Sequence, residues 1–129
     1  MNIPESLRYT EDHEWIKPVE GEEGMALIGI TDYAQSELGD LVYVEVETEG
    51  GQLSKGEIFG SVEAVKTTSD LYMPITGEVV SFNAELEDAP ETINEDPYEK
   101  GWIIKVKLDD PAEIEGLMSA AEYAEAIAQ

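Results

Sequence analysis

The 129-residue sequence contains no cysteine and a single histidine. Without cysteine there can be no disulfide, no thiolate metal site and no cysteine nucleophile, so any redox-active sulfur must arrive on a cofactor. No apolar run approaches the roughly 18–20 residues that cross a bilayer. The first residues also lack the pattern of a signal or transit peptide. We therefore expect a cytoplasmic protein, or a mitochondrial matrix protein if a transit peptide has been removed.

Basic residues are scarce as well. Seven lysines and arginines stand against 30 aspartates and glutamates, and the formal net charge is −23. This charge would repel phosphates and anionic lipid surfaces, so it argues against binding to nucleic acid or membranes. It suits a monomer that meets several partners briefly, each with a basic docking patch. Acidity that only confers solubility, or adapts the chain to high salt, is the alternative interpretation.

Motifs of catalysis are missing too, since the sequence has no G-x-S-x-G, P-loop or H-E-x-x-H pattern. His13, the one imidazole, is typical of a packing or hydrogen-bonding residue on a strand. Paired acids such as Asp109-Asp110 lie in turns, where water solvates them. We predict neither a metal site nor a self-contained active site, and hence a protein that is not itself an enzyme.

Short alternating strands with glycine-rich turns predict one mostly β domain over residues 1–129, a small sandwich or flattened barrel with helical additions. The expected strands are Tyr9–Val19, Met25–Ile30, Leu41–Val46, Glu57–Val65, Leu71–Ile75, Glu78–Asn83 and Trp102–Leu108. The acidic segment 84–101 is predicted to be a loop with one helical turn near Glu91–Asn94.

Helices are expected in two places. Thr31 can cap a short internal helix over Asp32–Leu38, which Gly39 ends. The tail, residues 112–129, is helical in character. In it, Ser119 and Glu122 fit a capping box in front of an alanine-rich final helix.

The central stretch over residues 60–77, GSVEAVKTTSDLYMPITG, predicts a hairpin with Lys66 at its tip. Apolar and β-favouring residues form its arms, and Lys66–Asp70 reads as the turn. Pro74 ends the second arm, because its ring removes a ladder donor. The small neighbours of Lys66 leave its amine free, as attachment of a group by an enzyme requires. A merely solvated surface lysine is the alternative.

The surroundings of Lys66 resemble the attachment hairpin of lipoyl-bearing domains. Glu63 lies three residues before the lysine, Ser69-Asp70 just after it, and Gly77 closes the second arm. The flanking sequence narrows this resemblance to one family, the H protein of the glycine cleavage system. The matching segments are Tyr9-Thr10, His13-Glu14-Trp15, Gly29–Gln35, Leu38–Asp40, Val62–Lys66, Ser69–Tyr72, Asn94–Tyr98, Gly101-Trp102 and Leu117-Met118 with Tyr123.

The resemblance implies a hybrid barrel–sandwich fold and a lipoic acid cofactor joined to Lys66 as lipoyl-lysine. It also implies a shuttle for the aminomethyl group of glycine. The expected partners are a pyridoxal-phosphate glycine decarboxylase, a folate-dependent aminomethyltransferase, dihydrolipoamide dehydrogenase and the lipoate-attaching enzymes.

Three further residues receive roles as hypotheses. Glu63 is assigned to recognition by the lipoate-attaching enzyme. Glu14 and Asp70 are candidates for a cleft that shelters the loaded arm, because a cationic amine would rest beside a carboxylate. The alternative is that Glu14 and Asp70 are exposed charges that take no part in such a cleft.

Other functions remain open at the level of sequence. A biotin carrier would place methionines beside the lysine, where this chain has Val65 and Thr67. A lipoyl domain of a 2-oxoacid dehydrogenase would be tethered to a catalytic chain by a flexible linker. A relay carrier in protein lipoylation would use the same lysine, and an unmodified structural β domain would use none.

Overall fold

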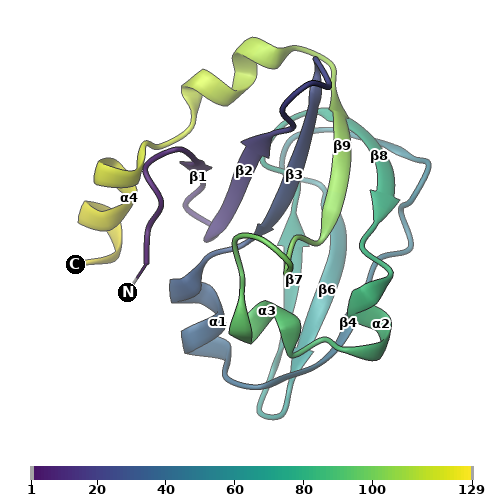
Figure 1. Cartoon of the computed structure of the whole chain (residues 1–129), viewed down its shortest axis with the longest axis vertical. Helices are drawn as coiled ribbons and strands as arrows, with labels where there is room; N and C mark the ends of the chain where they lie inside the picture. The colour runs from purple at the N-terminus through teal and green to yellow at the C-terminus, as the bar shows by residue number, and fades with distance from the viewer. Residues whose placement is uncertain (1, 129) are drawn as a thin grey trace.

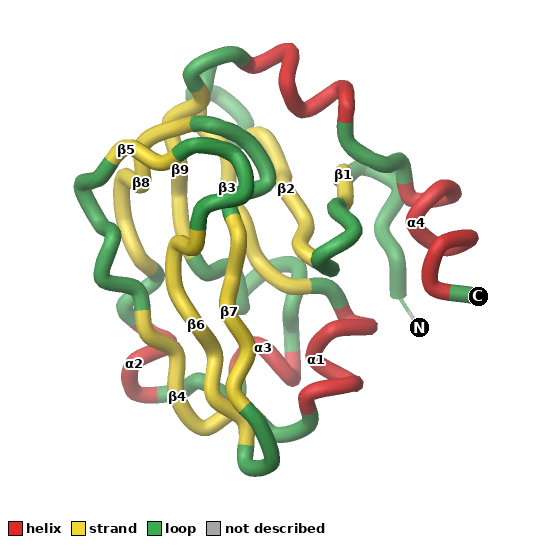
Figure 2. The backbone as a smooth tube through the Cα atoms, turned by 180° about the vertical axis from the view of Figure 1, so that it is seen from behind, coloured by secondary structure: helices red, strands yellow, loops and turns green. Residues whose placement is uncertain are grey.

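The computed structural model describes residues 2–128, and these form two layers of antiparallel β-sheet with short helices at the edges (Figures 1 and 2). The larger sheet has the order β1-β2-β3-β9-β8-β5, with β1 (Arg8–Tyr9), β2 (Glu14–Pro18), β3 (Met25–Ile30), β5 (Gln52–Leu53), β8 (Gly77–Phe82) and β9 (Ile104–Leu108). The smaller sheet has the order β4-β6-β7, with β4 (Leu41–Glu45), β6 (Ile58–Ala64) and β7 (Thr68–Tyr72). The predicted mostly β fold is therefore confirmed, although no strand pairing within residues 2–128 closes the two sheets into a barrel.

The internal helix forms where the sequence predicts it. Helix α1 covers Asp32–Leu38, and the Thr31 hydroxyl accepts a hydrogen bond from the Ala34 amide at 3.1 Å. Gly39 ends the helix with φ 83° and ψ −159°, a conformation that is nearly restricted to glycine. The helix runs along the open edge of β7, so it flanks the hairpin that carries Lys66 (Figure 2).

The tail is helical in two pieces, as expected. A 3₁₀ helix over Pro111–Gly116 precedes α4 (Ala120–Ile127). Both hydrogen bonds of the capping box between Ser119 and Glu122 are present. The first and last residues of the predicted domain, and the last residue of the predicted tail, lie outside the described residues.

Several predicted boundaries are wrong. Thr68, Ser69 and Asp70 belong to strand β7 and not to the turn, because Ser69 pairs with Val62 and Asp70 pairs with Ser61. The predicted edge strand Tyr9–Val19 is two strands, β1 and β2. Two short helices, α2 (Glu85–Asp88) and α3 (Thr92–Glu95), occupy the predicted acidic loop.

Two apolar clusters hold the structure together. The larger cluster lies between the two sheets and includes Phe59, Ile75 and Ile103, each with 0% exposure. The smaller cluster is aromatic and lies under α4 and the N-terminal segment, where Trp15 and Tyr123 are buried. Within residues 2–128, no helix combines the length and the apolar composition of a membrane span.

Candidate functional site

Lys66 lies at the tip of the β6–β7 hairpin and is exposed. The turn is tight, because the Ala64 amide donates to the Thr67 carbonyl at 2.7 Å. The neighbouring Val65 amide donates to the carbonyl of Asp40 at 3.1 Å, which attaches the turn to the chain between α1 and β4. The backbone around the lysine is thus fixed on two sides, while its side chain remains exposed.

Within residues 2–128, the amine of Lys66 has no carboxylate partner. Among residues 2–128 the single salt bridge joins Lys105 to Glu22 at 2.8 Å. The lysine side chain instead lies beside Gly39, with Cε 3.6 Å and Nζ 4.0 Å from the position that a Cβ on this glycine would occupy. An exposed, unpaired amine on a fixed turn fits the covalent attachment of lipoate through an amide bond.

Glu63 is exposed on β6, three residues before the lysine. It pairs in register with Thr68 of β7 and with Tyr43 of β4, so it stands in the middle of the smaller sheet. Tyr43 is 49% exposed. A protein that contacts the outer surface of this sheet near the hairpin tip would meet both side chains.

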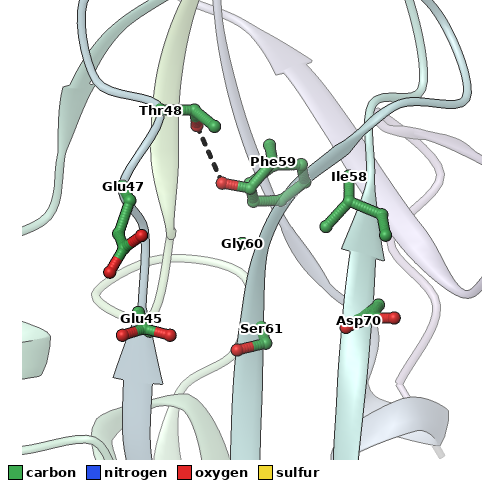
Figure 3. A pocket seen from close by; sticks show the side chains of 8 residues that line it. All are labelled: Glu45, Glu47, Thr48, Ile58, Phe59, Gly60, Ser61 and Asp70. Atoms are coloured by element: carbon green, nitrogen blue, oxygen red, sulfur yellow. Dashed lines mark hydrogen bonds between the residues drawn. The ribbon is translucent and has the colours of Figure 1, made fainter.

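Asp70 borders two hollows on opposite sides of β7. The first, of about 260 Å³, lies on the outer surface of the smaller sheet. Figure 3 shows Glu45, Ser61 and Asp70 at one level on three neighbouring strands, with Glu47 above them. The hollow is thus bordered by three carboxylates.

The second hollow, of about 240 Å³, is bounded by the open edge of β7, helix α1 and the turn between β1 and β2. Isoleucine, alanine and leucine side chains supply its apolar walls. Its polar lining consists of Asp12, His13, Tyr33, Glu37, Ser69 and Asp70. Of these, only Asp70 was predicted as a cleft residue. No local sequence signal marks Asp12 or Glu37, because both are surface acids in a chain with 30 acidic residues.

Glu14 is placed differently from Asp70. It is 1% exposed and is not among the side chains that line either hollow at Asp70. Its Oε2 accepts a hydrogen bond from the Tyr72 amide at 2.7 Å, so it connects β2 to the open edge of β7, two residues beyond Asp70. Its Oε1 is buried and has no hydrogen-bond partner among residues 2–128. Burial raises the pKa of Glu14 to about 8, against the effect of the Tyr72 hydrogen bond, so the carboxyl is mainly protonated at neutral pH.

His13 adopts a left-handed backbone conformation with φ 66°, which is uncommon for a residue with a side chain. Its Nδ1 lies 2.9 Å from the hydroxyl of Tyr123, and its ring lies 4.9 Å from that of Tyr33. Burial lowers the pKa of His13, and the nearby Asp12 and Glu37 oppose that shift. The histidine is a hydrogen-bonded packing residue, as predicted, and it also lines the second hollow.

Comparison with known proteins identifies the family. Residues 7–129 match the model of the family described as glycine cleavage H-protein. The chain is 53% identical over 129 residues to a glycine cleavage system H protein from Chlorobium limicola, with all of both chains covered. It also superimposes on a crystal structure of a glycine cleavage system H protein from Mycobacterium marinum with a TM-score of 0.88 and 40% identity, over 98% of this chain and 100% of the other. The chain therefore belongs to the glycine cleavage H-protein family, whose members are lipoyl carriers.

Proposed function

We propose that this protein carries lipoate on Lys66 and moves the aminomethyl group of glycine among three enzymes. These are a glycine decarboxylase, a folate-dependent aminomethyltransferase and dihydrolipoamide dehydrogenase. The observation that carries the proposal is the exposed amine of Lys66, unpaired at the end of a fixed hairpin, in a chain of the H-protein family. When attached, lipoate would supply a dithiolane that accepts electrons and a one-carbon unit, chemistry that a chain without cysteine lacks.

The chain itself presents the amine and provides a surface beside it. The hairpin arms are paired along their length, so the turn moves little relative to the sheets. Glu63 stands on the exposed side of the sheet, where we assign it to recognition by the lipoate-attaching enzyme. If Glu63→Gln is lipoylated at the normal rate, this assignment is wrong.

The hollow between β7 and α1 is the proposed resting place of the loaded arm. Asp70 lies on β7, four residues after Lys66, so at most roughly 13 Å of chain separates the two, a distance that a modified lysine can span. Asp70 shares the hollow with Asp12 and Glu37, and these carboxylates would attract a cationic amine. Glu14 lies behind this edge, where its Oε2 accepts a hydrogen bond from the Tyr72 amide and so connects β2 to β7. Because the carboxyl is mainly protonated at neutral pH, its buried Oε1 would carry the proton and could donate it.

The hollow can be tested through the lifetime of the glycine-derived one-carbon cargo on the protein. We expect Asp70→Asn to shorten that lifetime, because it removes a carboxylate from the lining of the hollow. Glu14→Gln should shorten it less, because glutamine replaces a carboxyl that lies behind the hollow and is already mainly protonated. Glu45→Gln, on the far side of the smaller sheet, is the matched control. Unchanged lifetimes in both variants would remove Glu14 and Asp70 from the proposed site.

The carrier function is tested by intact mass measurement and peptide mapping of the protein from its native host. We expect a mass gain that matches a lipoyl or octanoyl group, mapped to Lys66. Glycine-dependent loading in the presence of the decarboxylase then separates a glycine cleavage carrier from a relay in protein lipoylation. An unmodified Lys66 in cells that degrade glycine would refute the proposal.

A further inference from the structure

The lysine side chain rests on a turn that comes from a different part of the sequence. The turn consists of Gly39 and Asp40, between α1 and β4. Gly39 lies beside the end of the Lys66 side chain, and the Asp40 carbonyl holds the Val65 amide. The direction in which Lys66 leaves the hairpin therefore depends on the position of the Gly39–Asp40 turn.

That turn is held from behind by one side chain, Asn94 of helix α3. Its Oδ1 accepts a hydrogen bond from the Leu41 amide at 2.9 Å, and its Nδ2 donates to the Gly39 carbonyl at 2.9 Å. Nδ2 also donates to Oε1 of Gln35 on helix α1 at 2.9 Å. The amide thus binds the chain on both sides of Asp40 and connects it to the last turn of α1.

The pattern of partners requires asparagine at this position. One partner is an N–H donor and the other two are oxygen acceptors, so both ends of the side-chain amide are used in one orientation. Aspartate has the same shape but would turn an oxygen toward the Gly39 carbonyl and Gln35 Oε1, where two acceptors would repel it. Asn94 lines neither hollow at Asp70, but it does line a separate hollow of about 330 Å³ beside the N-terminal segment. Both ends of its side-chain amide are nevertheless bonded to Leu41, Gly39 and Gln35.

We propose that Asn94 is a positioning residue for lipoylation: it fixes the Gly39–Asp40 turn and thereby orients Lys66 toward the lipoate-attaching enzyme. This inference rests on the proposed function and adds to it a second segment that the modification requires. The enzyme would act on the hairpin tip and on a turn about 25 residues earlier in the chain as one surface, because the Val65–Asp40 hydrogen bond joins them. Misplacement of a reacting group by about 1 Å lowers rates by up to about 100-fold, so a loosened turn has a measurable effect.

The test compares Asn94→Asp with Asn83→Asp. Asn83 is a matched control because its hydrogen bonds have the same layout: Oδ1 accepts from the Glu85 amide, and Nδ2 donates to the carbonyls of Lys100 and Trp102. Both variants keep the side-chain shape, replace two hydrogen bonds to oxygen acceptors by repulsion between oxygens, and add one negative charge. None of the three partners of Asn83 belongs to the hairpin or to the Gly39–Asp40 turn.

Each unmodified protein is incubated with a lipoate–protein ligase, lipoate and ATP, and kcat and KM for lipoylation are followed by intact mass. We expect kcat/KM to fall about tenfold or more in Asn94→Asp, mainly through kcat, and to stay within about twofold in Asn83→Asp. Melting temperature and the rate of non-enzymatic acylation of Lys66 by an activated ester are measured in parallel. Acylation should be unchanged in both variants, because the amine stays exposed.

The inference would be overturned if Asn94→Asp kept the wild-type kcat/KM for lipoylation. It would also be overturned if Asn83→Asp lost as much kcat/KM as Asn94→Asp. In both cases the proposed function stands. A wild-type protein that accepts no lipoate would instead refute the proposed function, and the inference with it. If Asn94→Asp does not fold, Gln35→Leu removes a single partner of the amide. We expect that variant to lose about threefold in kcat/KM, the equivalent of one weak hydrogen bond, and no loss would again overturn the inference.

Discussion

The hairpin tip and the aromatic cluster under α4 are built in opposite ways. Around Lys66 the side chains are small or exposed, and Val65 is 73% exposed. In the aromatic cluster Tyr9, Trp15 and Tyr123 are at most 1% exposed, and the rings of Tyr9 and Tyr123 stack with centroids 4.8 Å apart. One region leaves an amine available, whereas the other contributes packing to the framework that holds it.

The polar atoms of the two regions differ in the same way. In the aromatic cluster the polar atoms of the rings are hydrogen-bonded. The Tyr123 hydroxyl is hydrogen-bonded to Thr31 and His13, and the Trp15 indole donates to the Pro97 carbonyl at 3.0 Å. Lys66 has no ion-pair partner within residues 2–128. Stability and chemistry are therefore separated in space, and each can be altered without the other.

Trp15→Ala should cause the greatest loss of stability. The ring is fully buried, and Gly29 lies against it so closely that a Cβ there would come within 2.7 Å of the indole. We expect a loss of about 3–5 kcal/mol in unfolding free energy, measured by urea denaturation. Trp102→Ala, at a half-buried position, should lose less. Lipoylation of the folded fraction should stay normal, and a loss there would contradict the separation of the two regions.

Glu14→Gln should change how stability depends on pH. Because the folded pKa is about 8 and the ordinary value is 4.5, the folded protein holds one proton more than the unfolded chain between these limits. The stability that this extra proton contributes is fully present below about pH 4.5 and is lost as the pH rises toward 8. Midway between these two pH values, the unfolding free energy should fall by roughly 1.4 kcal/mol per pH unit.

The measurement for Glu14 is the difference in unfolding free energy between wild type and Glu14→Gln at pH 5 and pH 8. Glutamine mimics the protonated acid, so the variant should gain on wild type as the pH rises. Glu63→Gln, an exposed carboxylate of the smaller sheet, is the matched control for the loss of a charge. A difference that stays constant with pH would contradict the buried, protonated state of Glu14.

His13→Asn should have a smaller effect of the opposite sign. Burial lowers the pKa of His13 below 6.5, so the unfolded chain takes up its proton first and stability falls as the pH drops below that value. Asparagine tolerates the left-handed backbone and does not titrate. We expect wild type to lose less than about 1 kcal/mol relative to the variant between pH 7 and 5, because solvent screens the half-buried ring. If the difference in unfolding free energy between wild type and His13→Asn is the same at pH 7 and pH 5, the ring titrates as in the unfolded chain and the prediction is wrong.

Lys66→Arg should leave stability unchanged within about 0.5 kcal/mol, because the side chain is exposed and makes no ion pair. Lipoylation should be lost completely, since a guanidinium does not form the amide. Lys55→Arg, at an exposed loop position, is the control and should be lipoylated normally. A mass gain on the Lys66→Arg protein would place the attachment elsewhere.

Elements with a local chemical signal were predicted well from the sequence. The Thr31 cap and Gly39 predicted the bounds of α1, and the Ser119–Glu122 box predicted the start of α4. The alternation of Leu41–Val46 predicted β4, which ends one residue earlier, at Glu45. In each case neighbouring residues hydrogen-bond or alternate within one element. Short-range chemistry is then sufficient.

Features that depend on distant partners were not predictable. The polar run Thr68–Asp70 has turn-like composition, yet pairing with β6 makes it a strand. Nothing in the sequence around Glu14 indicates that its carboxyl accepts a hydrogen bond from the Tyr72 amide, 58 residues away. The role of Asn94 likewise emerges only when α3 is packed against the end of α1. The exposed position of Lys66 at the hairpin tip was predictable, because the small polar residues after it mark a turn, whereas its modification stays a prediction.

The protonated state of Glu14 has a consequence for the electrical behaviour of the whole molecule. The formal charge of −23 counts every acid as ionised, so near pH 7 the native protein carries about one negative charge fewer than its composition states. In native electrophoresis the wild-type protein and Glu14→Gln should therefore migrate nearly together at pH 7 and separate increasingly as the pH rises through 8. The electrophoretic mobility of the native protein would then report the protonation of one buried side chain.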